Sequence, residues 1–261
     1  MHILVCIKQV PGTTNVQIDT EKGTLKREGV EAIINPFDEY AIEEAVRLKE
    51  KIGGKVTVVT MGPPQAEVAL RQAISVGCDE AILIGDRAFA GADTWATAYA
   101  ISTAIKTISD FGVIFCGKQA TDGDTAQVGP SVAEMLNIPH IAYVKKIEEV
   151  GESSIKVQRM MEDGYDLIES PVPCLLTVVK EINTPRIPSL RGKMLAKKAV
   201  IKQLNAQSIN ADTKKTGLAG SPTQVKKIFT PPQRKGGLVF EGEAQDIAAQ
   251  LVQKLKENSL I

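Results

Sequence analysis

Residues 114–130 read Ile-Phe-Cys-Gly-Lys-Gln-Ala-Thr-Asp-Gly-Asp-Thr-Ala-Gln-Val-Gly-Pro. The apolar run at 113–116 predicts a buried strand, and residues 132–136 predict a helix. Between them, a glycine and a dense group of small and polar residues predict a loop. Such a loop offers free backbone N–H donors, and a helix N-terminus carries partial positive charge. The stretch is therefore a candidate site for the phosphate groups of a nucleotide.

The chain before this stretch alternates between strand and helix patterns. Apolar runs predict strands at residues 3–7, 56–61, 81–84 and 113–116. Helical spacing of apolar residues predicts helices that follow Asn35-Pro36, follow Pro63-Pro64 and begin at Asp93. Strands joined by helices predict an α/β fold with a doubly wound, mostly parallel sheet, which is Rossmann-like or adenine nucleotide α-hydrolase-like. Residues 16–34 predict a hairpin or excursion with a turn at 21–23.

Two of these helix starts carry residues with two possible roles. Asn35 can cap its helix, which would explain the Asn-Pro-Phe-Asp motif without a ligand. Asp93 can cap its own helix, and the hydroxyls of Thr94 and Thr97 can either join that cap or bind a phosphate or ribose. Ligands bind parallel sheets beyond the carboxyl ends of the strands, where these helices begin. The residues alone leave capping and ligand binding open.

The loop after residue 116 holds more polar groups than a turn needs. Asp122 and Asp124 would repel phosphate, so we assign them to ribose hydroxyls, loop rigidity or helix capping. Backbone amides and Thr125 are expected to bind the phosphates. The chain has neither a GxGxxG nor a GxxxxGK[ST] pattern, so the site is not one of these two common phosphate-binding types.

The pattern changes from about residue 141. Apolar runs at 142–147, 155–159 and 175–179 predict an antiparallel β addition. Residues 183–235 are rich in Pro, Lys, Ser, Thr and Gly, which predicts a long arm without a core of its own. Residues 243–256 predict an amphipathic helix. We therefore divide the chain into a nucleotide-binding α/β domain at 1–182, a partner-recognition loop and arm at 183–235, and a C-terminal helix segment at 236–261.

A basic cluster at 186–202 surrounds Leu190, which we expect to be exposed. An apolar anchor ringed by positive charge suits a transient protein contact, although a solvated basic loop would have the same composition. The arm and its helix can likewise wrap a partner or dock on their own domain.

Composition excludes several classes of function. Lys plus Arg equal Asp plus Glu at 31 each, and aromatic residues make up only 4%, so nucleic-acid binding is not expected. No apolar run reaches the length of a membrane span, and the N-terminus enters a strand without a signal-peptide pattern. Four cysteines without metal-ligand spacing and two histidines indicate reduced thiols in the cytoplasm and no metal site.

The chain resembles the β subunit of electron transfer flavoproteins over essentially its whole length. The resemblance is carried by residues 5–10, by 35–38 and the helix that follows, by 61–63, by 117–124 with Gln127 and Gly129, and by 157–177. One departure is Asp166, where the family pattern usually has Glu or Gln.

The resemblance implies a heterodimer with an α subunit that carries a flavin. In conventional members the β site holds AMP, whereas in the electron-bifurcating branch it holds FAD, which accepts hydride from NADH. Residues 87–97 and 122–129 resemble the bifurcating branch, and Gly123 would leave room for the larger ligand. Carried over by position, the cofactor-binding residues are Cys6, Asn35, Pro36, Phe37, Asp38, Met61, Asp93, Thr94, Thr97, Gly117, Lys118, Gln119, Ala120, Thr121, Asp122, Gly123, Asp124, Thr125, Ala126, Gln127 and Val128.

The resemblance also implies partners. Electrons from the β flavin would divide between ferredoxin or flavodoxin and, through the α-subunit FAD, an acyl-CoA dehydrogenase-type flavoenzyme. Leu190, Arg191 and Lys193 resemble the family's recognition loop for that flavoenzyme, and the C-terminal arm would embrace the α subunit. No side chain need act as acid or base, so we name no catalytic residue. Two alternatives remain, a conventional AMP-containing carrier and a stand-alone ATP-binding domain of similar fold.

Overall fold

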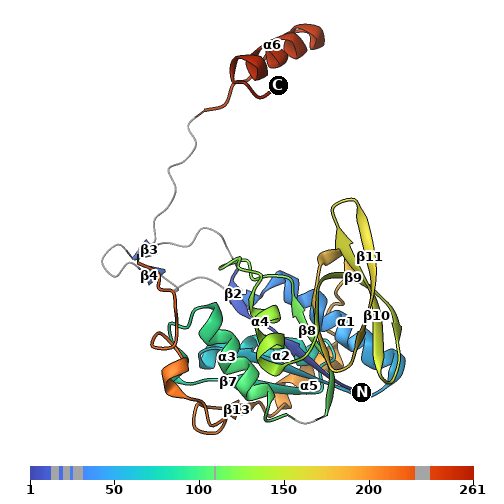
Figure 1. The fold of residues 1–261 in the computed structure, drawn as a ribbon, viewed down its shortest axis with the longest axis vertical. Coiled ribbons are helices and arrows are strands. Elements are labelled where there is room, and N and C mark those ends of the chain that lie inside the picture. The colour runs from blue at the N-terminus through green and yellow to red at the C-terminus, as the bar shows by residue number, and fades with distance from the viewer. Residues whose placement is uncertain (13–17, 20–23, 26–31, 109, 227–235) are drawn as a thin grey trace. The chain divides into compact units, whose positions relative to one another are not determined.

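The computed structural model describes residues 1–12, 18–19, 24–25, 32–108, 110–226 and 236–261. The chain divides into two units, residues 1–226 and 227–261. Nine strands of the described residues form one sheet in the order β11-β10-β9-β12-β8-β1-β6-β7-β13 (Figure 1). They are β1 (His2–Cys6), β6 (Lys55–Met61), β7 (Glu80–Ile84), β8 (Phe111–Gly117), β9 (His140–Val150), β10 (Ser154–Met161), β11 (Gly164–Pro171), β12 (Cys174–Val178) and β13 (Lys202–Leu204).

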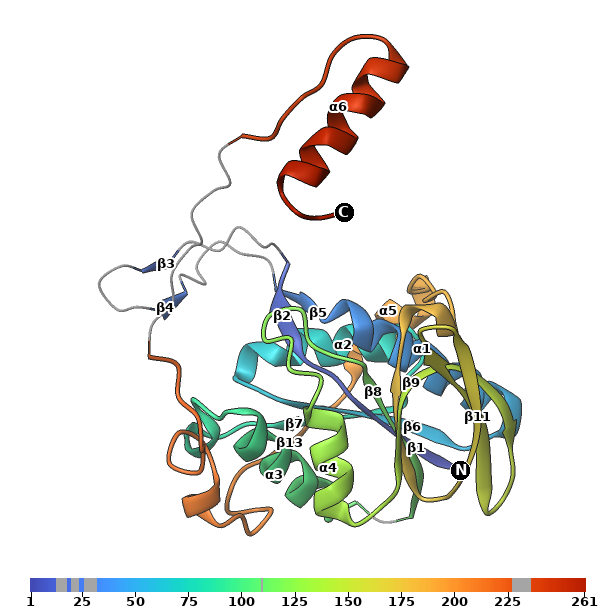
Figure 2. The ribbon, with the colours of Figure 1, turned by 45° about the horizontal axis from the view of Figure 1, so that its top comes forward.

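Helices of the first unit cover both faces of this sheet (Figure 2). Helices α1 (Pro36–Ile52), α2 (Glu67–Ser75) and α5 (Leu190–Lys198) bury apolar side chains in one core. Helices α3 (Thr94–Ile105) and α4 (Val128–Leu136) bury theirs in a second core on the other face. The doubly wound α/β fold that the sequence predicts is therefore confirmed.

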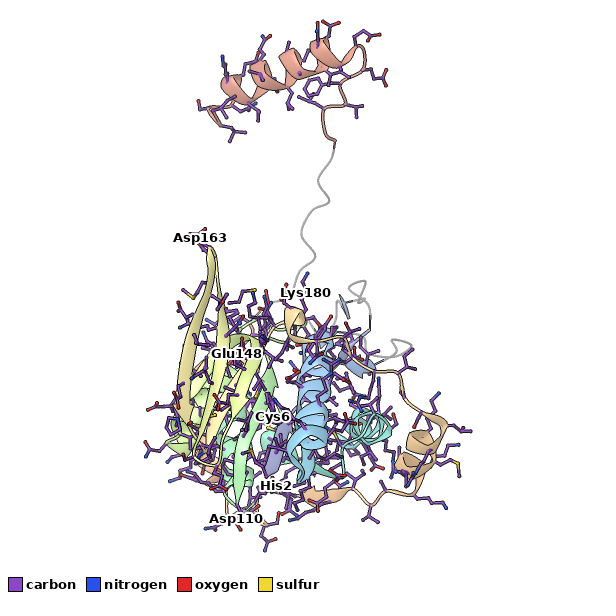
Figure 3. All side chains as sticks on the ribbon, turned by 90° about the vertical axis from the view of Figure 1, so that its right-hand side faces the viewer. His2, Cys6, Asp110, Glu148, Asp163 and Lys180 are labelled. Atoms are coloured by element: carbon purple, nitrogen blue, oxygen red, sulfur yellow. The ribbon has the colours of Figure 1, made fainter. Side chains whose placement is uncertain are left out.

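Strand β1 shows how the sequence builds the two cores. Side chains alternate between the faces of a strand, so Ile3 and Val5 lie in the first core and Leu4 and Cys6 in the second. Because both faces are covered, the strand is a continuous apolar run, as is usual for central parallel strands. Figure 3 shows Cys6 in the interior of the unit.

The direction predicted for one strand is wrong. The run at 175–179 was expected to be antiparallel, but β12 lies between β8 and β9 and is parallel to both. All five residues of β12 are buried, and a short apolar run of this kind does not reveal its direction. The antiparallel part is β9, β10 and β11, and the last of these was not predicted. Asp163 lies at the tip of the β10–β11 hairpin (Figure 3).

The compact unit extends beyond the boundary at residue 182 that the sequence suggested. Helix α5 packs on α2, and β13 adds a parallel edge strand to β7. Their few buried apolar residues, spread among lysines and other polar residues, pack against the main core: Ala196, Ile201, Leu204, Ala206 and Ile209. The segment has no core of its own, yet it completes that of the first unit, and the boundary falls after Lys226.

The second unit contains helix α6 (Ala244–Glu257), which confirms the helix predicted at 243–256. No residue of α6 is buried. In the excursion of the first unit, β2 (Gln9–Pro11) pairs with β5 (Ala32–Ile34), and β3 (Ile18–Asp19) pairs with β4 (Thr24–Leu25). The predicted turn at 21–23 lies outside the described residues. No helix within the described ranges has the length and apolar character needed to cross a membrane.

Candidate functional site

The candidate loop, residues 118–127, lies at the carboxyl edge of the sheet. It follows β8, whose neighbour β1 ends at the same level, with Cys6 opposite Cys116 in the parallel register. Helix α4 begins directly after the loop, at Val128. No side chain of the described residues caps this helix. The N–H groups of Val128 and Gly129 therefore stay available to a ligand, whereas Pro130 has none.

A buried carboxylate anchors the start of the loop. Asp38 is only 6% exposed. It accepts hydrogen bonds from the backbone N–H of Lys8 at 2.7 Å and of Gly117 at 3.1 Å. Burial raises the pKa of Asp38 to about 7, and hydrogen bonds from Asn35, Lys8 and Gly117 oppose that rise. Asp38 thus ties the ends of β1 and β8 together.

Asn35 anchors the next part of the loop. Its side-chain Nδ2 donates to the carbonyl of Gln119 at 2.8 Å, and its Oδ1 accepts from the N–H of Thr121 at 3.1 Å. The capping role considered for Asn35 is therefore wrong: its side chain makes no cap hydrogen bond and binds the loop instead. We call Asn35 and Asp38 the loop clamp. Both hold backbone of the site in place.

The two acids of the loop, Asp122 and Asp124, also have partners. Lys8 Nζ lies 2.6 Å from Asp122 Oδ1, and Gln119 donates to the carboxylate of Asp124. Asp124 and Ala126 have left-handed φ values of 52° and 55°, a conformation that non-glycine residues adopt at some cost. Of the roles considered for the two acids, the pairing favours loop rigidity, and neither caps α4.

Two residues at the site were missed by sequence reasoning. Lys8 lies two positions beyond β1, and its place after a strand end was the available signal. Tyr143 comes from β9, and only the fold brings it close. The ammonium of Lys118 lies over the ring of Phe37 at 5.2 Å and over that of Tyr143 at 5.8 Å. These cation–π contacts orient Lys118 beside the loop.

Two glycines permit the close packing of the loop and its helix. A Cβ on Gly117 would lie 2.4 Å from Asp38 Oδ1, and one on Gly129 would lie 2.8 Å from the Thr177 methyl group. Gly123 in the middle of the loop has no heavy atom near its Cβ position. The loop is therefore tightly packed at its ends and open at Gly123.

The start of helix α3 differs from that of α4. Asp93 caps α3, because its Oδ1 accepts from the N–H of Ala96 at 3.0 Å. Its Oδ2 accepts from the N–H and the hydroxyl of Thr223, at 2.9 and 2.8 Å. Thr94 and Thr97 lie on the first turn and are half-buried. The capping role predicted for Asp93 is therefore confirmed, and its carboxylate is already fully engaged.

The remaining predicted residues lie at the same edge or on the surface. Met61 ends β6 and packs beside the α3–α4 core. Leu190 is 78% exposed, as expected, at the start of α5, whose N-cap is Ser189. Arg191 and Lys193 are on the same helix. Among the described residues, no three His, Cys, Asp or Glu side chains gather as a metal site would require.

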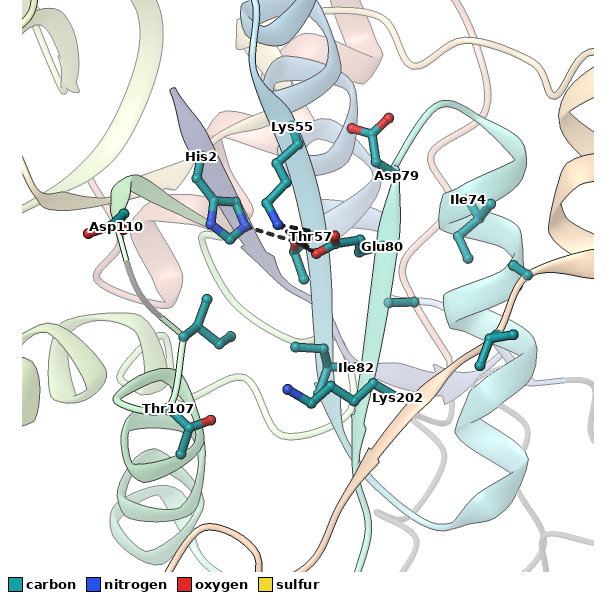
Figure 4. Close-up of a pocket in the computed structure, with 14 residues that line it drawn as sticks. His2, Lys55, Thr57, Ile74, Asp79, Glu80, Ile82, Thr107, Asp110 and Lys202 are labelled. Carbon is teal, nitrogen blue, oxygen red and sulfur yellow. Dashed lines mark hydrogen bonds and ion pairs between the residues drawn. The ribbon is translucent and has the colours of Figure 1, made fainter.

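A hollow of about 630 Å³ lies at the amino edge of the sheet, opposite the edge that carries the loop. Figure 4 shows the residues that line it. His2 contacts the hydroxyl of Thr57 at 2.8 Å, and that hydroxyl donates to Glu80 at 3.0 Å. Lys55 also pairs with Glu80, at 3.0 Å. Much of the charge in the hollow is thus neutralised within the chain, and we do not assign the nucleotide site to it.

Comparison with known proteins gives consistent matches. A family model described as an electron transfer flavoprotein domain matches residues 22–209. The electron transfer flavoprotein subunit beta of Thermoanaerobacterium thermosaccharolyticum is 52% identical over 100% of both chains. The caffeyl-CoA reductase-Etf complex subunit CarD of Acetobacterium woodii is 47% identical, again over 100% of both. The acryloyl-CoA reductase electron transfer subunit gamma of Anaerotignum propionicum is 44% identical over the same full coverage.

Proposed function

The chain belongs to the electron transfer flavoprotein family as a β-subunit-type chain, and we propose that it is the β subunit of an electron-bifurcating member with FAD in its own site. The observation that carries this proposal is the clamped loop leading into an uncapped helix. The clamp fixes backbone, and the free helix end offers N–H donors where a nucleotide phosphate would bind.

The residues present fit a dinucleotide in several respects. Backbone amides at the start of α4 would hold phosphate, with Thr125 beside them. Lys118, held between two rings, adds a positive charge near the loop. The open space at Gly123 leaves room beyond a mononucleotide, and Thr94 and Thr97 would meet the more distant part of the ligand. Asp93 keeps that helix start in place through its cap.

The loop and the start of α3 would hold FAD, whose chemistry is acceptance of hydride from NADH and single-electron transfer, here to ferredoxin or flavodoxin and to the α-subunit FAD. The chain's own residues would bind and orient it, and no side chain need act as acid or base. An acyl-CoA dehydrogenase-type flavoenzyme would take the electrons that pass through the α subunit. Two relatives whose names place them with acyl-CoA reductases support that class of partner. The α subunit would be embraced by the arm and α6, and the complex would act in the cytoplasm.

A conventional carrier with AMP in the same site is the second candidate. It is favoured by the saturated carboxylate of Asp93, which has no free oxygen to offer a larger ligand. The loop clamp alone would suffice to hold AMP. The proposals differ in nucleotide content, so the test is extraction of the co-purified α–β heterodimer. Two FAD molecules per heterodimer support bifurcation, whereas one FAD and one AMP would establish the conventional carrier.

A further inference from the structure

The recognition segment, residues 183–200, has an exposed apolar middle and two fixed ends. Five large apolar side chains on it are exposed: Ile187, Leu190, Met194, Leu195 and Val200. Four basic residues accompany them: Arg191, Lys193, Lys197 and Lys198. An exposed loop of this composition would ordinarily be mobile, and a mobile loop loses conformational entropy when it docks.

The first anchor is Arg186, at the start of the segment. Its guanidinium binds Glu43 of α1 through Nε at 2.8 Å and Nη2 at 3.2 Å, and its backbone N–H donates to the same carboxylate at 3.1 Å. It also binds Glu50 at 2.6 and 3.0 Å. Glu43 is 4% exposed, so its burial alone would raise its pKa, but hydrogen bonds from Arg186 and Arg47 hold that pKa below the usual range. One arginine thus engages two carboxylates of one helix.

The second anchor is Arg71 of α2, at the end of the segment. Its Nη1 donates to the carbonyl of Ala196 at 2.6 Å and to that of Ala199 at 3.1 Å. These carbonyls belong to the C-terminal turn of α5 and the residue after it, where backbone acceptors lack helical partners and a positive charge is favourable. Glu67, one turn before Arg71, orients the guanidinium through contacts at 2.6 and 2.9 Å.

Helix α5 is also seated closely on α2. A Cβ on Gly192 would lie 2.0 Å from the carbonyl oxygen of Ser75, so only glycine fits there without displacement. Ala196, one turn later, is buried in the same contact. The face of α5 opposite this contact carries Leu190 and Met194. The packing of α5 on α2, together with Arg71 and Arg186, sets the orientation of this exposed face.

We infer that Arg71 and Arg186 are positioning residues for partner docking, which hold the recognition segment in its binding conformation without touching the partner. This inference rests on the proposed docking of an acyl-CoA dehydrogenase-type flavoenzyme at Leu190. It adds two residues to that function: Arg71, which lies on α2, and Arg186, which is bound to α1. The occupant is a protein with an apolar pocket rimmed by acidic groups, because the segment offers an apolar anchor among four basic side chains.

The test uses the complete α–β heterodimer and a purified acyl-CoA dehydrogenase-type flavoenzyme that exchanges electrons with the wild type. Arg71→Gln should raise the apparent KM for that flavoenzyme about tenfold and leave kcat and flavin content near wild type. Arg71→Lys, which keeps a donor for the carbonyls, should restore part of the loss. Glu67→Gln is the matched control, because it removes the charge of Glu67 but keeps a side-chain oxygen that accepts from Arg71, so the carbonyl contacts of Arg71 remain. Thermal melting shows that each variant is folded.

A double-mutant cycle with Leu190→Ala separates positioning from direct contact. If Arg71 acts through the placement of Leu190, the combined variant will lose less than the product of the single losses. A full multiplicative loss would overturn the inference, as would a wild-type KM for both Arg71→Gln and Arg186→Gln while Leu190→Ala is impaired. If Leu190→Ala itself transfers electrons normally, the docking function fails and the inference fails with it.

Discussion

Helices α3 and α4 pack on each other and both begin at the carboxyl edge of the sheet, yet their N-termini are built differently. Asp93 caps α3 and also binds Thr223. No side chain of the described residues caps α4, although a polar loop precedes it. Two acids in that loop were available for capping, and both bind other partners instead.

The difference teaches where a ligand can bind. A side-chain cap occupies N–H groups of the first turn, whereas an uncapped helix end keeps them for an anion. The loop before α4 is held by Asn35 and Asp38, which are remote in sequence and buried. We propose that these anchors keep the α4 end fixed and open to a ligand. The predictions below test that contrast; the first has the largest expected effect on the β-site nucleotide and the last has the smallest.

Gly117→Ala should have the largest effect on the site. The new Cβ would meet Asp38 Oδ1 at 2.4 Å, so the clamp must move. We expect a loss of about 1–3 kcal/mol in the free energy of unfolding and loss of most nucleotide from the β site. Gly85→Ala is the matched control. Gly85 follows β7 on the chain segment that leads to α3, and a Cβ there would lie no closer than 3.4 Å to another heavy atom, an ordinary contact. Denaturant unfolding and nucleotide extraction check both; equal effects of the two substitutions would break the contrast.

Asn35→Ala should weaken the β-site nucleotide more than Asp93→Ala does. The first leaves the Gln119 carbonyl and the Thr121 N–H without their partner, which costs about 1–3 kcal/mol. The second removes a helix cap, worth about 1 kcal/mol, and lowers Tm by a few degrees. Dissociation of the β-site nucleotide, followed by the fluorescence of the single tryptophan, Trp95, gives the comparison. If the nucleotide dissociates faster from Asp93→Ala than from Asn35→Ala, the ligand binds at the start of α3 instead of at the clamped loop before α4.

Asp38 should make stability depend on pH. Its folded pKa, about 7, lies above the unfolded value near 3.8. The folded state therefore binds the proton more tightly, and stability is lost as pH rises from about 4 through 7. Relative to the non-titrating Asp38→Asn, the wild type should lose roughly 2–4 kcal/mol across that range. Urea unfolding at several pH values measures this difference; a pH-independent difference would show that the clamp does not titrate there.

Asp122→Asn should have the smallest effect. Its pair with Lys8 is partly exposed, and such pairs contribute less than about 1 kcal/mol. We expect a modest fall in β-site FAD occupancy with α-site occupancy unchanged, and the same pattern for Thr94→Ala. Flavin quantification on each heterodimer decides the point. Equal loss from both sites would mean that these residues act on the assembly instead.

The fold class was predictable because its signals are local. Apolar runs for β1, β6, β7 and β8 and helical spacing in α1 to α3 follow directly from periodicity. The direction of β12 was not predictable, because five buried residues in a row look the same in a parallel or antiparallel strand. The packing of 183–226 was missed because its few buried apolar residues are separated by lysines and other polar residues and are buried only against distant elements.

The sequence named many of the residues that meet at this edge of the sheet, but not the contacts that they make. Asn35 looked like a helix cap, since a cap and a loop anchor use the same side chain; only the approach of residues 119–121 distinguishes them. Lys8 follows β1 and Tyr143 lies in β9, and no spacing in the sequence relates them to Lys118 or Asp122. Asp93 was identified correctly as a cap, because its partner Ala96 is local.

The most direct test of the central claim is the nucleotide content of three co-purified heterodimers: wild type, Asn35→Ala and Asp93→Ala. The account predicts two FAD molecules per heterodimer in the wild type, close to one in Asn35→Ala, and a value near the wild type in Asp93→Ala. AMP in place of the second FAD would contradict bifurcation. Full occupancy in Asn35→Ala would contradict the placement of the ligand at the clamped loop.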